Sequence, residues 1–187
     1  MRFPAPKLVS AVAAIAFVTA PAFATMMVRL SLDELASQSD AVVVVTANDA
    51  QSRWDNGHIV TDVSVRIDRV LAGTTESATV VVRLPGGVVD GTGQRVEGAP
   101  TLARGAQRVL FLRREAAGRY HVAGMAQGAL PVTTDASGAA HVGPADSSSV
   151  SLVEPQVANH SRVAMPRGGM SLTTFAQTVG AMRLRAP

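Results

Sequence analysis

Between positions 59 and 68 two kinds of residue alternate, and this pattern constrains the fold more than any other feature of the sequence. Successive side chains of a β-strand point to opposite faces, so a period of two predicts a strand with one face in the core and the other mostly in water. The positions expected to face the core are Ile59, Thr61, Val63, Val65 and Ile67. The strand is expected to continue to Leu71 and to end at Ala72-Gly73.

The segment before this strand predicts its hairpin partner. Residues 41–46 read Ala-Val-Val-Val-Val-Thr, and β-branched residues on both faces are typical of a strand that is buried on two sides. Between the two strands, Asn56-Gly57 supplies the positive φ angles that a tight hairpin turn requires. We therefore expect a long hairpin whose tip is formed by residues 53–57.

Further strands are expected at residues 78–84, 107–114 and 119–125, with one more hairpin between 129 and 142. Ser31 and Glu34 match a capping box, which predicts a short helix before the first strand. Ser171 precedes a second helix, in which apolar residues recur every three to four positions. The predicted fold is mainly β: a small five- to seven-stranded antiparallel OB-like barrel flanked by a short N-terminal helix and a C-terminal helix.

The first 24 residues have the order of a secretory signal peptide. Arg2 and Lys7 precede an uncharged stretch that closes with Ala22-Phe23-Ala24, which predicts cleavage after Ala24. A retained membrane anchor is the alternative, but Pro21 interrupts a stretch already shorter than the roughly 20 apolar residues that a spanning helix needs. We therefore expect a secreted or periplasmic protein with no membrane span after cleavage.

The rest of the chain is expected to divide into three parts. Residues 25–142 form the β-barrel domain, residues 143–169 form a mostly irregular linker, and residues 170–185 form the C-terminal helix that packs on the barrel. The linker is inferred from its loss of periodicity after Val142 and its run of small polar residues.

Composition argues against several classes of function. Beyond residue 24 the 15 basic residues are all arginine and oppose 14 acidic residues, a net charge of +1 that gives no basic surface for nucleic acid. The chain has no cysteine, so disulfides and thiolate metal ligands are impossible. Aromatic residues make up only 4% of the sequence, which leaves little material for base-stacking platforms.

No catalytic motif is recognisable in the sequence. The histidines at positions 58, 121, 141 and 160 lack the close spacing of a His-Glu-x-x-His zinc site. There is no Gly-x-Ser-x-Gly nucleophile elbow, and Gly91-Thr92-Gly93 does not open a helix as a phosphate-binding loop would. We expect no catalytic residue, no metal and no cofactor.

Two segments are candidate contacts for a partner. Residues 85–105, here called the glycine-rich segment, are expected to form an unusually long loop, and such loops are usually either functional or disordered. The polar residues available for recognition in this segment are Asp90, Gln94, Arg95 and Glu97. Trp54 at the hairpin tip is the only tryptophan; it either packs on its own strands or contacts a partner, as tryptophans at binding hot spots do.

Two helices around a five-stranded antiparallel core resemble the netrin-type module, the OB-fold relative found in tissue inhibitors of metalloproteinases. The residues that carry this resemblance are Asp40 to Val44, Arg69 to Gly73 and Gly118 to Gly124. The resemblance implies the barrel fold. Those inhibitors grip a protease's zinc through an amino-terminal cysteine, whereas this chain would begin at Thr25 and contains no cysteine, so the resemblance does not extend to that mechanism.

The sequence therefore predicts an exported, non-enzymatic binding or scaffold domain. Its partner is expected to be another exported or cell-envelope protein, contacted through the glycine-rich segment and the hairpin tip. Two alternatives remain open at this point: an inhibitor or accessory protein of a secreted peptidase, and a hydrolase whose catalytic residues are dispersed along the chain.

Overall fold

The computed structural model describes residues 26–115, 118–146, 148–153, 163, 168–182 and 184. The predicted signal peptide, residues 1–24, lies outside the described residues. Within the described part of the chain, no helix has the length and apolar character needed to cross a membrane.

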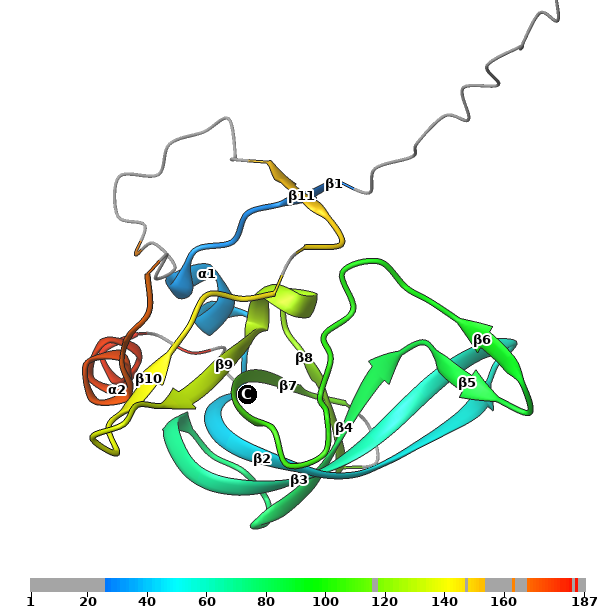
Figure 1. Ribbon diagram of the computed structural model, residues 1–187, viewed down its shortest axis with the longest axis horizontal. Helices are drawn as coiled ribbons and strands as arrows, with labels where there is room; N and C mark the ends of the chain where they lie inside the picture. Colours follow the sequence, from blue (N-terminus) through cyan, green and yellow to red (C-terminus); the bar gives the residue numbers. More distant parts are fainter. Residues whose placement is uncertain are drawn as a thin grey trace, which may run out of the picture.

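The fold is mainly β with two α-helices, as predicted (Figure 1). The helices are α1 (Leu32–Ser37) and α2 (Leu172–Gly180), and a 3₁₀ helix, η2, spans Met125–Gly128. The longer strands are β2 (Ala41–Asp55), β3 (His58–Gly73), β4 (Thr79–Pro85), β7 (Gln107–Arg114), β8 (Arg119–Val122) and β9 (Ala129–Thr134). The short strands are β1 (Met26–Val28), β5 (Gly87–Val89), β6 (Thr92–Gln94), β10 (Ala140–Val142), β11 (Ser151–Val153) and β12 (Met170–Ser171).

Eight strands form one large sheet in the order β12-β10-β9-β7-β2-β3-β4-β8, and β8 pairs with β7 as well as with β4. The pairings of β7, β2, β3, β4 and β8 therefore form a closed circuit of five strands. The sequence predicts antiparallel neighbours throughout, but β4 and β8 run parallel. Five strands in a circuit cannot all alternate in direction, so one pairing has to be parallel.

The β2–β3 hairpin is confirmed and is longer than predicted, because β2 continues from the valine-rich segment to Asp55. The turn at Asn56-Gly57 has φ angles of 50° and 81°, the positive values expected of this pair. The register shifts at three places in the hairpin, between Val42 and Val43, Val44 and Val45, and Ala47 and Ala50. Such bulges bend and twist a strand. The hairpin joins the circuit at two levels, because β2 pairs with β7 near its base through Ala41–Thr46, whereas β3 pairs with β4 nearer its tip through Val60–Arg66.

Two hydrophobic cores lie on the two faces of β2 and β7. Val43, Val45, Leu110 and Leu112 belong to the core shared with β3, β4 and β8. Their neighbours in sequence, including Val44 and Phe111, belong to a second core under the helices. The prediction that residues 41–46 are buried on both faces is confirmed for residues 41–45, whereas Thr46 is partly exposed. The helices account for the second covered face.

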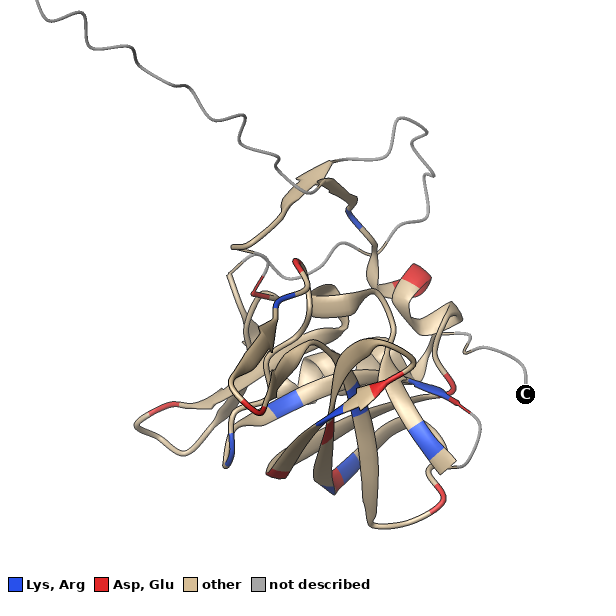
Figure 2. Ribbon diagram, turned by 90° about the vertical axis from the view of Figure 1, so that its right-hand side faces the viewer, with Lys and Arg blue, Asp and Glu red and all other residues tan. Residues whose placement is uncertain are grey.

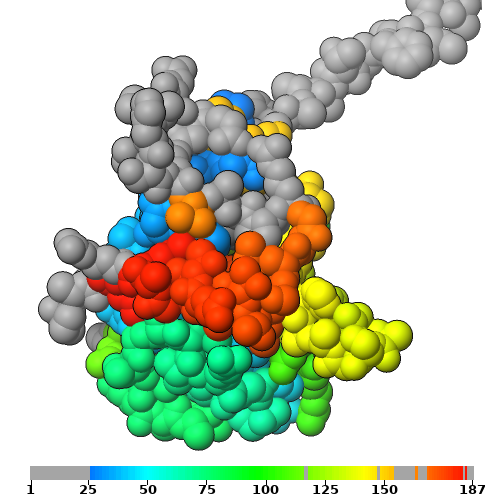
Figure 3. Space-filling model, turned by 90° about the vertical axis from the view of Figure 1, so that its left-hand side faces the viewer, coloured from blue at the N-terminus to red at the C-terminus, as the bar shows by residue number. Residues whose placement is uncertain are grey.

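Both predicted helices are present with their caps. The Ser31 hydroxyl accepts from the Glu34 N–H, and the Glu34 carboxylate accepts from the Ser31 N–H at 2.8 Å, which completes the capping box. Ser171 caps α2 by accepting from the Thr174 N–H at 3.1 Å. Buried Phe175 of α2 contacts Phe111 edge to face, with ring centroids 6.4 Å apart. Figure 3 shows α2, in red and orange, lying against the green-blue surface of β3.

The glycine-rich segment differs from the expected irregular loop, because it contains a short hairpin of β5 and β6. Asp90 and Gly91 form its turn with φ angles of 49° and 76°. An Asp-Gly pair favours this two-residue turn for the same reason as Asn-Gly. In Figure 1 the small hairpin lies over the tip of β2–β3, at the opposite end of the molecule from α2.

The segment predicted as mostly irregular, residues 143–169, contains β11, which pairs in parallel with β1. Its residues 147, 154–162 and 164–167 lie outside the described residues. The chain between β1 and α1 is held by the buried side chain of Gln127, which donates to the Val28 carbonyl at 3.0 Å and accepts from the Leu30 N–H at 2.9 Å. The Gln127 side-chain amide thus makes the two backbone hydrogen bonds that a neighbouring strand would otherwise make.

Candidate functional site

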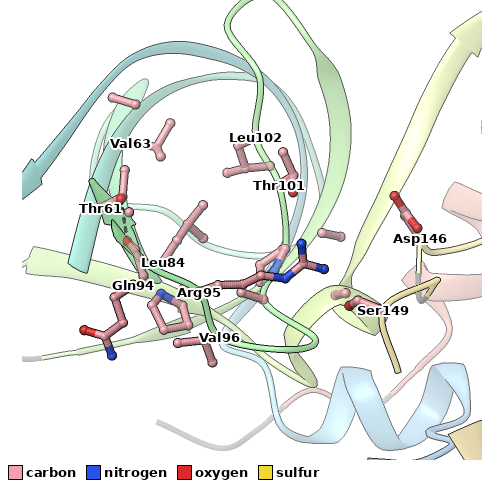
Figure 4. A pocket seen from close by; sticks show the side chains of 18 of the residues that line it. Thr61, Val63, Leu84, Gln94, Arg95, Val96, Thr101, Leu102, Asp146 and Ser149 are labelled. Atoms are coloured by element: carbon pink, nitrogen blue, oxygen red, sulfur yellow. Dashed lines mark hydrogen bonds between the residues drawn. The ribbon is translucent and has the colours of Figure 1, made fainter. Parts of the chain in front are cut away.

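One pocket of about 780 Å³ lies where the glycine-rich segment crosses the end of the β2–β3–β4 sheet (Figure 4). Its walls come from these three strands and from the glycine-rich segment, and Asp146, Ser148 and Ser149 complete them. Pockets that bind small molecules or peptide side chains commonly have volumes of a few hundred to about 1,000 Å³. This pocket is therefore large enough for several side chains of a partner or for one small ligand.

The floor of the pocket is a continuation of the first hydrophobic core. It is formed by four almost fully buried apolar residues, Val63, Leu84, Leu102 and Ala129. Leu102 comes from the glycine-rich segment itself, so this segment contributes to the core as well as to the pocket wall. An apolar floor next to a polar rim is the usual composition of a binding site.

One end of the glycine-rich segment is fixed to the β2–β3 hairpin. The Gly86 N–H donates to the Ile59 carbonyl at 2.8 Å, and the Thr61 hydroxyl donates to the Gly86 carbonyl at 2.7 Å. At Gly87, with a φ of 141°, an added Cβ would overlap the hydroxyls of Ser52 and Thr61, so only glycine lets the backbone lie this close to the sheet.

The other end of the segment is fixed to the body of the fold. The Gly98 N–H donates to the Ser149 hydroxyl at 3.2 Å, and the Gly98 carbonyl accepts from the Ala126 N–H at 2.8 Å. The Gly105 N–H donates to the Ala47 carbonyl at 2.8 Å. The segment is thus held at both ends, which gives the pocket a defined wall.

The polar rim of the pocket carries both signs of charge. Arg95 extends across the pocket towards the side on which Asp146 and Ser149 lie (Figure 4), and its Nε forms an ion pair with Glu97 at 2.8 Å. Hydrogen bonds from the Ser148 side chain and N–H lower the pKa of Asp146, and the nearby charge of Arg108 lowers it further, against the opposing effect of burial. Arg108 lines the pocket from β7.

The residues predicted for partner contact are only partly brought together. Gln94 and Arg95 line the pocket, and Glu97 joins them through its ion pair with Arg95. Asp90 lies exposed in the β5–β6 turn, and Trp54 is half exposed near the hairpin tip; neither lines the pocket. The structure thus separates a pocket group from two exposed residues at the tips of the hairpins.

Sequence reasoning missed Arg108, Thr101 and Asp146, and it missed the apolar floor. The one available signal was the position of Arg108, which lies two and four residues before the core residues Leu110 and Leu112. That spacing places an arginine on the inward face of a strand. Asp146 and Thr101 lie in segments without periodicity, where no pattern indicates which residues meet.

Charged residues elsewhere pair on the outer face of the sheet, where Figure 2 shows acidic and basic positions interspersed on the strands. The most extensive network joins β2, β3 and β4. Arg83 bonds Asp62 through Nε at 2.8 Å and through a terminal nitrogen at 3.0 Å, and it bonds Asp55 at 2.8 Å. Arg53 adds a bond to Asp62 at 3.3 Å. These pairs hold three strands together.

In the described part of the chain, two histidines contact a carboxylate. His121 is 3.1 Å from Glu115, and His141 is 2.9 Å from Asp135. Ser137 bonds the same Asp135 at 2.6 Å, so serine and histidine both contact the acid, whereas an activated serine has to bond the histidine. Among the described residues, no three His, Asp or Glu side chains are placed to hold a metal ion. His160 lies outside them.

No family model, curated protein or solved structure matches this chain.

Proposed function

We propose that this chain is an exported binding domain, without catalytic activity, whose partner is another exported or cell-envelope protein that enters the pocket beside the glycine-rich segment. Export rests on the signal-like order of residues 1–24. The partner's place rests on the site described above.

The observation that carries this proposal is that the glycine-rich segment is hydrogen-bonded to the rest of the fold along its length. A loop that served only as a connection would need none of these bonds to the rest of the fold: Gly86 and Gln94 both bond Ile59, Gly98 bonds Ser149 and Ala126, and Gly105 bonds Ala47. These bonds hold the backbone as the wall of a pocket whose floor is apolar and buried. A site that is formed before its partner arrives loses less conformational entropy on binding.

We also propose that the circuit of β7, β2, β3, β4 and β8 forms a small OB-like barrel. Support comes from the order of the pairings, in which the third and fifth strands of the circuit in sequence, β4 and β8, are parallel neighbours. In such a barrel the pocket would lie at one open end, with the interior residues Val63 and Leu84 as its floor.

A substitution that fills the pocket tests the proposed function. Ala50 lines the pocket and is exposed, so Ala50→Trp adds a large side chain there without crowding the core. Thr133→Trp, at an exposed position of β9, is the matched control. Immobilised wild type, Ala50→Trp and Thr133→Trp proteins are each incubated with the exported fraction of the source cells, and the retained proteins are quantified by mass spectrometry.

We expect a partner that is retained by the wild type and by Thr133→Trp and is reduced at least about tenfold by Ala50→Trp, with circular dichroism and thermal unfolding unchanged. Equal retention by all three proteins would place the partner elsewhere on the surface and would contradict the proposal.

A further inference from the structure

Arg108 occupies an unusual place for a charged residue. It lies at the start of β7 on the face that carries Leu110 and Leu112, both of which are fully buried in the first core. Across the sheet it faces Val45 of β2 and Pro131 of β9. Its side chain is partly buried and lines the pocket.

Arg108 also differs from the other arginine of the pocket in having no direct partner. Arg95 is paired with Glu97, whereas the guanidinium of Arg108 makes no hydrogen bond or ion pair within the part of the chain that the structure describes. The nearby Asp146 carboxylate interacts with this charge without bonding it. A partly desolvated charge that is not directly bonded is costly for the folded protein, and a bound anion would reduce that cost. The Thr101 hydroxyl on the pocket wall is likewise without a hydrogen-bond partner among the described residues.

We infer that the pocket binds the carboxyl-terminal end of an apolar peptide, with the terminal carboxylate at Arg108 and the aliphatic side chains on the floor of Val63, Leu84 and Leu102. This inference rests on the proposed function and names the part of the partner that enters the pocket. Arginine is the side chain best suited to a carboxylate, because its planar guanidinium donates two parallel hydrogen bonds.

A peptide fits the pocket better than a simple fatty acid does. Thr101 offers a hydroxyl to the same space, and a peptide amide can bond it while an alkyl chain cannot. The glycine-rich segment also brings backbone alongside the pocket, next to which an extended peptide can lie.

Asp146 determines whether removal of a negative charge near Arg108 should strengthen or weaken ligand binding. Its carboxylate is bonded to the side chain and N–H of Ser148, and it lies on the same rim, near enough to Arg108 for the two charges to interact. A ligand carboxylate at Arg108 would be repelled by Asp146, so removing that charge should strengthen binding. A ligand with a positive end would show the opposite response.

The test uses protein purified from the exported fraction and a pool of N-acetylated hexapeptides with Val, Leu or Ile at the last three positions. The pool is prepared as the free acid and as the C-terminal amide, and octanoate serves as the alkyl carboxylate. Affinity is measured by titration calorimetry, and the site is located by amide chemical shifts in nuclear magnetic resonance spectra. Arg113→Gln is the matched control for Arg108→Gln, because Arg113 is an exposed arginine of the same strand.

We expect the acid pool to shift the amides of residues that line the pocket and to bind at least about tenfold more tightly than the amide pool and octanoate. Arg108→Gln should lower the affinity for the acid pool at least about tenfold, and Arg113→Gln should change this affinity by less than about twofold. Asp146→Asn should raise it.

Equal affinity for acid and amide, no loss in Arg108→Gln, octanoate as tight as the peptides, or no binding of the acid pool would each overturn this inference. The pocket-filling experiment decides the proposed function separately, because it scores an intact partner whatever part of that partner enters the pocket.

Discussion

The side-chain carbonyl oxygen of Gln94 accepts a hydrogen bond from the backbone N–H of Ile59 at 2.6 Å. Gln94 ends β6 in the glycine-rich segment, and Ile59 lies next to the tip of the β2–β3 hairpin. The two segments that the sequence indicates as separate candidate contacts are therefore parts of one structural unit. Because Ile59 is only 1% exposed, its N–H depends on this acceptor rather than on water.

Replacing Gln94 by alanine should release the small hairpin from the long one. Gln94→Ala leaves the Ile59 N–H without its acceptor, and we expect a loss of about 1–3 kcal/mol in the free energy of unfolding. Urea denaturation measures this loss, and hydrogen exchange at the Ile59 amide should become faster. Gln51→Ala, at an exposed position of β2, should change stability by less than about 0.5 kcal/mol. Equal effects of the two substitutions would show that the bond does not hold the segment.

Gly87 should not tolerate a side chain. In Gly87→Ala the new Cβ overlaps the Ser52 and Thr61 hydroxyls, and its backbone lies in a region that side chains disfavour, so we expect a loss of roughly 1–3 kcal/mol. Gly93→Ala is the control, because its Cβ would meet only the Val88 side chain at 3.9 Å. Thermal unfolding of both variants is the measurement. If Gly87→Ala unfolds at the wild-type temperature, the close approach of the segment to the sheet is wrong.

The Arg83 network should make stability depend on pH on the acid side. Hydrogen bonds from Arg83 lower the pKa of Asp62, burial opposes them, and the charge of Arg83 and the contacts of Arg53 add to the lowering. A carboxyl whose pKa is lower in the folded state binds fewer protons there than in the unfolded chain. Its contribution to stability is therefore complete above the unfolded value of about 3.9 and is lost as pH falls through the folded value.

We accordingly expect Arg83→Gln to lose about 1–2 kcal/mol of unfolding free energy at pH 7 and to approach the wild type progressively as pH falls below about 4. Urea titrations at several pH values test this convergence. Arg69→Gln removes the same charge from an exposed position of β3 and should lie close to the wild type throughout. If the difference in unfolding free energy between Arg83→Gln and the wild type stays constant down to pH 2, the ion pair of Arg83 with Asp62 is not the cause of that difference.

Trp54 should matter more for binding than for folding. It is 50% exposed, so Trp54→Ala should change the free energy of unfolding by less than about 1 kcal/mol. If the partner extends from the pocket to the hairpin tip, as the sequence predicts, the same substitution weakens its binding at least about tenfold. Val81→Ala, at an exposed position of β4, is the control. Unchanged affinity in Trp54→Ala would limit the contact to the pocket.

Much of the fold follows from local patterns in the sequence. The alternation at residues 59–67, the Asn56-Gly57 turn and the Ser31–Glu34 capping box each depend on neighbouring residues, and each is present as predicted. The parallel pairing of β4 with β8 is not local, because it depends on how five strands close a circuit. The β5–β6 hairpin was missed although Asp90-Gly91 indicates a turn, since its three-residue strands are too short to show alternation.

The site was less predictable than the fold for the same reason. Gln94, Arg95 and Glu97 are close in sequence and were identified together. Arg108 and Asp146 meet them only through tertiary structure, and the apolar floor cannot be distinguished in the sequence from ordinary core residues. The sequence therefore indicated residues of the glycine-rich segment that line the pocket, but it did not indicate the pocket itself.

The most direct test of the proposed binding site is site-specific photo-crosslinking at Thr101 in the full-length protein. Thr101 is exposed and lines the pocket, whereas Thr133 is exposed on β9 away from it. We predict that a photoreactive residue at position 101 yields one discrete adduct with an exported or envelope protein, and that the same residue at position 133 yields none. Equal adducts at both positions, or adducts at position 133 alone, would contradict a binding site beside the glycine-rich segment.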